Sequence, residues 1–149
     1  GVYSDLKRHE EAIADCSASI AINPENPQAL NFRGALHMVS GRHADVQADL
    51  TAASGLAPAW ADPTYNRAIV ALCQADWTTV VEFATRAIAL TKADEAPPDR
   101  EELAVMFGAR SVALEKLGDV TGAETDRHEA LVLNPSFDPG IWSATPRYR

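Results

Sequence analysis

Prolines recur along this chain at a regular interval. Pro24 and Pro58 lie 34 residues apart (58 − 24), and Pro135 follows Pro58 after two further intervals and nine extra residues. When the sequence is shifted by this register, Arg33 aligns with Arg67, and Arg67 aligns with Arg110. A pattern that recurs at this spacing predicts a row of similar supersecondary units, each packed on its neighbours, rather than one irregular core.

The spacing of apolar and small residues within each repeat indicates helices. Leu30, Gly34 and His37 recur at helical intervals, and no stretch alternates between apolar and polar residues as a strand would. Proline at the repeat boundaries ends helices, while Gly41 and Gly118 suit the turns between paired helices. We expect helices near residues 10–22, 28–40, 43–56, 62–75, 78–92, 99–117 and 120–133, after a short helical remnant at 2–6.

The repeat resembles the tetratricopeptide repeat, a helix–turn–helix unit of 34 residues. The family pattern places small residues in both helices, a turn between them and a closing proline. The second repeat fits it with Gly34, Gly41, Val46, Leu50, Ala53 and Pro58, and the fourth with Ser111, Gly118, Ala123, Arg127, Ala130 and Pro135. The third repeat has Ala68, Ala75, Val80, Ala84 and Ala87, but Lys92 where the proline is expected.

The resemblance implies an all-α fold, a right-handed α–α superhelix, or solenoid, of about four such units. We expect a repeat domain over residues 1–135, with repeats at about 1–26, 27–60, 61–103 and 104–135, and a C-terminal tail at 136–149. The first repeat starts part-way, and the chain begins at Gly1 without a methionine, so we expect a fragment or a processed form. Phe137, Ile141 and Trp142 of the tail are expected to fold back over the last helix.

Composition narrows the classes of partner. The formal net charge of −8 argues against nucleic acid, because binding phosphates requires clustered Lys and Arg. No apolar run reaches the roughly 18 residues of a membrane span, so membrane insertion is not expected. Cys16 and Cys73 are too few for a disulfide framework and are interpreted as reduced thiols of a cytoplasmic protein.

Candidates for chemistry are few. His9 and His43 occupy the same repeat position, and His37 occupies the position of Tyr3, so we interpret these histidines as aromatic substitutes in the packing. No His or Cys spacing is typical of a metal site, and neither cysteine has a nearby histidine that would activate it. We therefore expect no enzyme activity, no metal and no cofactor.

Charged residues recur in the same register as the prolines. Asp15, Asp49 and Asp126 align with one another, and Phe83 takes this position in the third repeat. We expect Arg33 to pair with Asp15 of the preceding repeat or, failing that, with Asp49 of its own. Arg67 is likewise expected to pair with Asp49, and Arg110 to lack a partner in the preceding repeat.

The resemblance also implies a concave surface lined by the first helix of each repeat. The residues expected to bind a peptide there are Asn31, Phe32, Met38, Tyr65, Asn66, Ile69, Leu72 and Cys73. In the fourth repeat the corresponding positions are Val105, Gly108, Ala109, Val112, Glu115 and Lys116. The tail residues Phe137 to Trp142 are a competing occupant of this surface.

The expected function is a protein–protein interaction module, an adaptor or scaffold that binds a peptide or helix of a partner protein. One alternative is a regulatory or accessory domain of a larger enzyme or signalling protein. The abundance of Ala, and of Arg over Lys, indicates a bacterial source for such a protein. A second alternative is self-association into a homo-oligomer.

Overall fold

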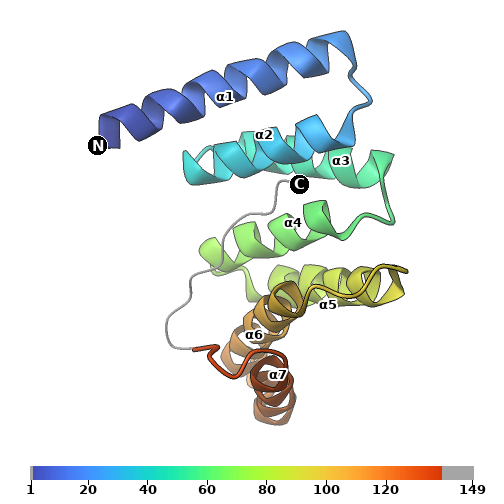
Figure 1. Ribbon diagram of the computed structural model, residues 1–149. Helices are drawn as coiled ribbons and strands as arrows, with labels where there is room; N and C mark the ends of the chain where they lie inside the picture. The colour runs from blue at the N-terminus through green and yellow to red at the C-terminus, as the bar shows by residue number, and fades with distance from the viewer. Residues whose placement is uncertain (1, 139–149) are drawn as a thin grey trace. The chain divides into compact units, whose positions relative to one another are not determined.

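A computed structural model describes residues 2–138 of the chain. Seven α-helices, and no strands, make up the regular structure of these residues (Figure 1). The helices are α1 (Val2–Ile22), α2 (Pro27–Val39), α3 (His43–Leu56), α4 (Ala61–Cys73), α5 (Trp77–Ala93), α6 (Arg100–Lys116) and α7 (Val120–Leu133). The all-α prediction is confirmed, and none of the described helices is long and apolar enough to cross a membrane.

The first helix differs from the expected pattern. Residues 2–6 and 10–22 were expected to form separate helices, but α1 continues without a break from Val2 to Ile22. The residues between them, Lys-Arg-His, include neither glycine nor proline, and each tolerates a helical backbone. Nothing in the local sequence therefore ends the helix there.

Within each half of the chain, three consecutive helices pack side by side. The chain divides into two compact halves within α4: the N-terminal half ends at Asn66 and the C-terminal half begins at Arg67. In the N-terminal half α2 packs against both α1 and α3. In the C-terminal half α6 packs against both α5 and α7. Each half therefore contains a central helix with a partner on either side.

Three tight turns share one backbone geometry. Gly41, Ala75 and Gly118 have positive φ angles of 74°, 54° and 91°, and each follows the first helix of a pair. The residue after each of them donates its N–H to the carbonyl oxygen five positions earlier, as in Arg42 to His37 at 3.0 Å. The glycine turns were predicted, but the helix expected to continue to residue 75 ends at Cys73, because Ala75 adopts the left-handed conformation.

Side chains cap most of the helix starts. Asn26 accepts a hydrogen bond from the Ala29 N–H at 3.1 Å, and Pro27 occupies the first turn of α2, where its missing N–H is not needed. Asp99 caps α6 and accepts a hydrogen bond from the Glu102 N–H at 3.0 Å. Asp76 and Asp119 cap α5 and α7 in the same way. These caps fix where each helix begins.

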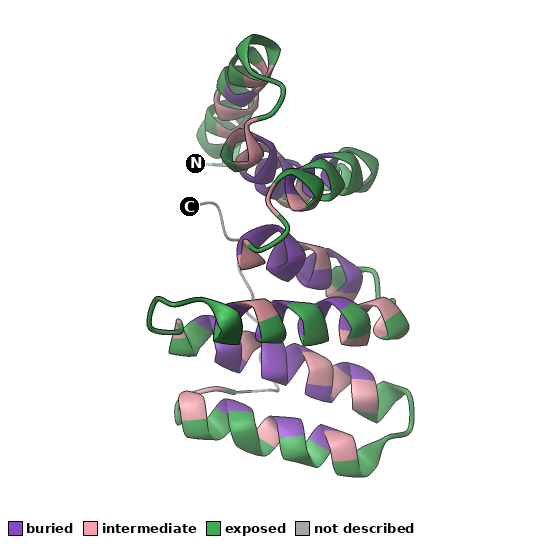
Figure 2. Cartoon of the chain, turned by 90° about the vertical axis from the view of Figure 1, so that its right-hand side faces the viewer, coloured by how far each residue is buried: buried purple, intermediate pink, exposed green. Residues whose placement is uncertain are grey.

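Small residues allow the paired helices to approach closely. A Cβ atom added to Gly34 would lie 2.8 Å from Leu50 Cδ2, closer than such atoms approach one another. Leu50 itself is completely buried (buried residues are purple in Figure 2). The same kind of position is taken in the C-terminal half by Ser111, which is also fully buried. The recurrent small residues of the sequence are therefore packing positions between helices.

Candidate functional site

Arg33 binds both oxygens of one carboxylate across the α2–α3 pair. Its Nε and Nη2 atoms each lie 2.7 Å from an oxygen of Asp49, and Asp49 is only 4% exposed. Its remaining nitrogen, Nη1, donates to Ser17 Oγ on α1 at 3.2 Å. One guanidinium thus joins three consecutive helices of the N-terminal half through fixed, charge-assisted hydrogen bonds.

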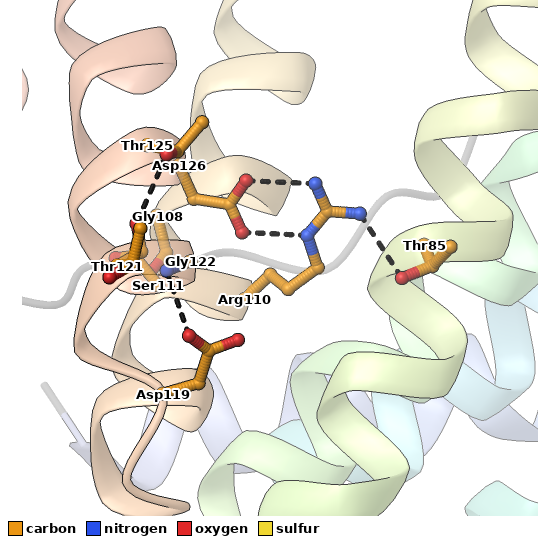
Figure 3. A network of polar contacts seen from close by, with 9 residues as sticks. All are labelled: Thr85, Gly108, Arg110, Ser111, Asp119, Thr121, Gly122, Thr125 and Asp126. Atoms are coloured by element: carbon orange, nitrogen blue, oxygen red, sulfur yellow. Dashed lines mark hydrogen bonds and ion pairs between the residues drawn. The ribbon is translucent and has the colours of Figure 1, made fainter.

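Arg110 repeats this arrangement in the C-terminal half (Figure 3). Its Nε and Nη2 atoms donate to the two oxygens of Asp126 on α7, at 2.7 and 2.8 Å. Its Nη1 donates to Thr85 Oγ1 on α5 at 3.1 Å. In both pairs the arginine precedes its aspartate by 16 residues, and both aspartates come from the second helix of a pair. We call these two clusters the arginine clamps.

Arg67 has a different partner at the same offset. Its guanidinium carbon lies 4.1 Å from the centroid of the Phe83 ring, an arrangement in which the cation is attracted to the face of the ring. The Arg67 Nε atom is buried and has no hydrogen-bond partner in the described structure. The third repeat therefore replaces the aspartate of the clamp with an aromatic face.

The expected pairing between neighbouring repeats is only partly correct. Arg33 binds Asp49 of its own repeat, the second of the two partners considered for it, while Asp15 is exposed on α1. Within its own half, Arg67 lies over the Phe83 ring, and its expected pair with Asp49 of the other half stays a prediction. Arg110 binds Asp126 of its own repeat, and its partner in the preceding repeat is the hydroxyl of Thr85. The offset of 16 residues spans a helix pair, and this geometry selects the partner.

The pKa values of the clamped arginines and of Arg67 are shifted in opposite directions. Hydrogen bonds that Arg33 and Arg110 donate to Asp49 and Asp126, respectively, raise the pKa of each arginine against the opposing effect of burial. Burial, followed by repulsion from Arg86, lowers the pKa of Arg67. All three remain charged at neutral pH, because a guanidinium titrates far above it. The clamps are therefore permanent ionic contacts and not acid–base groups.

The remaining titratable residues do not form a reactive cluster. No group of three or more His, Cys, Asp or Glu residues within the described ranges could hold a metal ion. His37 is buried, and its Nε2 lies 3.9 Å from Asp49 Oδ2, beside the clamp. Cys16 is buried and Cys73 is exposed, and both are free thiols. His37 and Cys16 therefore contribute to the packing of the N-terminal half.

In the N-terminal half, two of the predicted peptide-binding residues form a buried asparagine pair. Asn66 Nδ2 donates to Asn31 Oδ1 at 3.0 Å, and both residues are completely buried. Tyr65 is also buried, whereas Phe32 and Met38 are half-buried. The structure therefore brings two predicted polar residues into direct contact and leaves part of two apolar side chains accessible.

In the C-terminal half, the predicted residues come from the second part of α4. Ile69 is buried, Leu72 is half-buried and Cys73 is exposed. Their exposure increases toward the end of the helix, so Leu72 and Cys73 are the accessible members of this set. Peptide binding by these residues remains a prediction.

Phe137 occupies part of the surface expected on α6. A Cβ atom added to Gly108 would lie 2.7 Å from Phe137 Cε1 and nearer still to Cζ, so the ring rests directly on the glycine backbone. The tail was expected either to fold over the last helix or to occupy this surface, and the Phe137 contact with α6 agrees with the second possibility. Ile141 and Trp142 lie outside the described residues.

The sequence also did not indicate a groove beside the second clamp. Its volume is about 340 Å³, and it is lined by residues of α5, α6 and α7: Val81, Thr85, Arg110, Leu114, Gly122, Thr125 and Asp126. The polar groups of Arg110 and Asp126 are already bonded to each other, so the groove presents hydroxyls and apolar side chains around a neutralised ion pair.

A scan against protein-family models finds no match to this chain, and a search of curated proteins finds none at a significant level.

Proposed function

We propose that the chain is a module of tetratricopeptide-type repeats that binds a segment of a partner protein and acts as an adaptor or scaffold. In this proposal the repeats form a right-handed superhelix, and the first helices carry the binding surface. The support for the repeat assignment is the recurrence of local geometry, namely three positive-φ turns and two arginine clamps with one offset of 16 residues.

The observation that carries the binding proposal is the partial exposure of Phe32 and Met38 on α2. The buried hydrogen bond between Asn66 and Asn31 joins α4 to this helix, while Phe32 and Met38 remain partly accessible. Aromatic and methionine side chains are typical anchors of protein-binding sites. An apolar or mildly basic segment suits this surface, because the net charge of −8 attracts basic partners at long range.

The test is partner capture by the full-length protein carrying Phe32→Ala or Met38→Ala. Truncation of a true anchor costs about 2 kcal/mol or more of binding free energy, so capture should fall at least tenfold. Leu56→Ala, at an exposed residue of α3, is the matched control and should bind normally. Tyr65 is buried, so its truncation would test the fold instead. Unchanged capture by both anchor variants, with the fold intact, would exclude this surface.

Exposed apolar residues on α1 favour self-association as a second candidate function. Val2, Tyr3 and Leu6 are 79%, 84% and 53% exposed, and they lie within two turns of one helix. A stable interface needs more than about 1,000 Å² of buried surface in total, which these residues would supply only in part. Sedimentation velocity of the wild type and of Leu6→Glu separates the two functions. A dimer that this substitution dissociates would favour self-association.

A further inference from the structure

Gly108 lies in the interior of α6, where glycine is an unfavourable residue. Glycine loses more backbone freedom in a helix than any other residue, so its presence there calls for a local reason. The structure supplies one, because the Phe137 ring lies where a Cβ atom would be. Atoms of this kind do not come within 3.0 Å of one another, so even alanine would displace the ring. Gly108 therefore forms a seat for an aromatic side chain.

A short turn delivers Phe137 to this seat. The α7 helix ends at Leu133, and the Asn134 side chain then accepts a hydrogen bond from the Ser136 N–H at 3.1 Å. The Asn134 carbonyl accepts from the Phe137 N–H at 2.9 Å. These bonds close an Asn-Pro-Ser-Phe turn that reverses the chain toward α6. Phe137 is only half-buried, so its ring is held at the surface rather than within the core.

The seat lies among residues that the repeat register assigns to partner binding. Val105 and Val112, three positions before and four positions after Gly108, are both half-buried, so the helix presents apolar side chains on either side of the seat. Gly108 and Phe137 both belong to the C-terminal half. The occupant of this surface in the structure is the chain's own Phe137.

We propose that the Gly108 seat is an aromatic-accepting subsite that Phe137 blocks in cis, and that a partner segment carrying a phenylalanine must displace it. The proposal rests on the proposed function, since it names the chemistry of one part of that surface. An intramolecular ligand on a short connection acts at an effective concentration in the millimolar range. The apparent affinity for a partner is reduced by the fraction of molecules with an open seat. The turn is thus an autoinhibitory contact.

A peptide of the turn itself is the probe. We would label residues 132–139, Val-Leu-Asn-Pro-Ser-Phe-Asp-Pro, and measure fluorescence anisotropy with the full chain. Phe137→Ala should open the seat and bind the peptide at least about tenfold more tightly than the wild type, because the competing ring is gone. A peptide with alanine in place of its phenylalanine should not bind. Equal binding of the probe by the two proteins, or no binding by Phe137→Ala at millimolar concentration, would overturn the proposal.

Two glycine substitutions provide the matched controls. Gly108→Ala in the Phe137→Ala background places a methyl group in the seat and should abolish peptide binding. Gly55→Ala in the same background has open space around the added Cβ and should leave binding unchanged. Both changes replace glycine with alanine within a helix, so circular dichroism should show intact folds. Retention of peptide binding by the Gly108→Ala double variant would contradict the assignment of the seat.

A second measurement does not depend on the Phe137→Ala protein. In the otherwise wild-type chain, Gly108→Ala should displace the ring and speed chymotrypsin cleavage after Phe137 severalfold, with Gly55→Ala cleaved at the wild-type rate. Unchanged cleavage would overturn the cis contact. The outcome is separable from that of the proposed function, because partner capture there depends on Phe32 and Met38. If Phe32→Ala and Met38→Ala had no effect on partner capture, the result of the peptide-binding experiment would still be valid.

Discussion

Arg67 holds its guanidinium over the ring of Phe83, 4.1 Å from the centroid, at the position where Arg33 and Arg110 each bind an aspartate. The ring satisfies the charge in part, but the buried Nε of Arg67 has no hydrogen-bond acceptor in the described structure. Burial accordingly lowers the pKa of Arg67, whereas the clamped arginines have raised pKa values. The third repeat thus has the arginine of the clamp, Arg67, but has Phe83 in place of the aspartate.

The matched substitutions Phe83→Asp and Phe83→Asn test this relationship. Both should destabilise the protein, because removing a buried phenylalanine costs about 3–5 kcal/mol. The Asp variant should be the more stable of the two by about 1.5–3 kcal/mol, since it gives Arg67 an ionised acceptor at the clamp offset. Urea unfolding at neutral pH measures the difference. The difference should vanish in an Arg67→Met background, and equal stabilities with Arg67 present would refute the clamp geometry.

Breaking either arginine clamp should destabilise its half of the chain. Asp49→Asn and Asp126→Asn each keep the size of the side chain but remove the charge that accepts two hydrogen bonds, and each should cost about 1.5–3 kcal/mol. Glu115→Gln is the control, because the Arg127–Glu115 pair is exposed and such pairs contribute at most about 1 kcal/mol. Denaturant titration of the three variants measures the loss in the free energy of unfolding for each, which should be larger for the two clamp variants than for Glu115→Gln. A larger loss for Glu115→Gln than for Asp49→Asn would contradict it.

The fold was largely readable from the sequence because its helix boundaries are encoded locally. Prolines and the turn glycines each act within a few residues, and the helices of the structure end and turn near the positions that the repeat register gave them. The exceptions have physical causes. Ala75 takes a left-handed conformation that its residue type does not signal, and α1 continues because no residue near position 8 ends a helix.

The candidate site was less predictable because it depends on contacts between helices. The register identified Arg33, Asp49 and Phe83 as recurrent positions, but choosing among partners required the geometry of a helix pair. The constant offset of 16 residues was already present in the sequence and could have selected the pairing. The apolar tail indicated that Phe137 could occupy this surface, but the sequence did not identify Gly108 as its contact, because a single irregular turn joins the tail to the helix.

The two cysteines should differ in reactivity. Burial raises the pKa of Cys16, more than Arg33 lowers it, while Cys73 is exposed. Cys73 should therefore react first with a thiol reagent at pH 8, and in Cys73→Ser the remaining thiol should react only as fast as the protein opens. Equal labelling rates of the two thiols would contradict this account.

The raised pKa of Cys16 also links stability to pH. Because this pKa is higher in the folded than in the unfolded protein, its contribution to stability is present below the ordinary thiol pKa of about 8.5 and is lost as pH rises through the folded value.

Replacing Ala75 with glycine should stabilise the protein. Ala75 has a φ angle of 54°, at the turn position that Gly41 and Gly118 fill with φ angles of 74° and 91°. A left-handed alanine costs about 1–2 kcal/mol, and glycine removes this cost while increasing the entropy of the unfolded chain. The net gain should be about 0.5–1 kcal/mol in the free energy of unfolding. Gly41→Ala and Gly118→Ala are the reverse controls: an added Cβ meets nothing within 4 Å at either site, so any loss comes from the backbone alone. A lower melting temperature for Ala75→Gly would contradict this prediction. If Gly41→Ala and Gly118→Ala also lowered the melting temperature, the result would mean that contacts of the Ala75 methyl group stabilise the turn by more than its left-handed backbone costs.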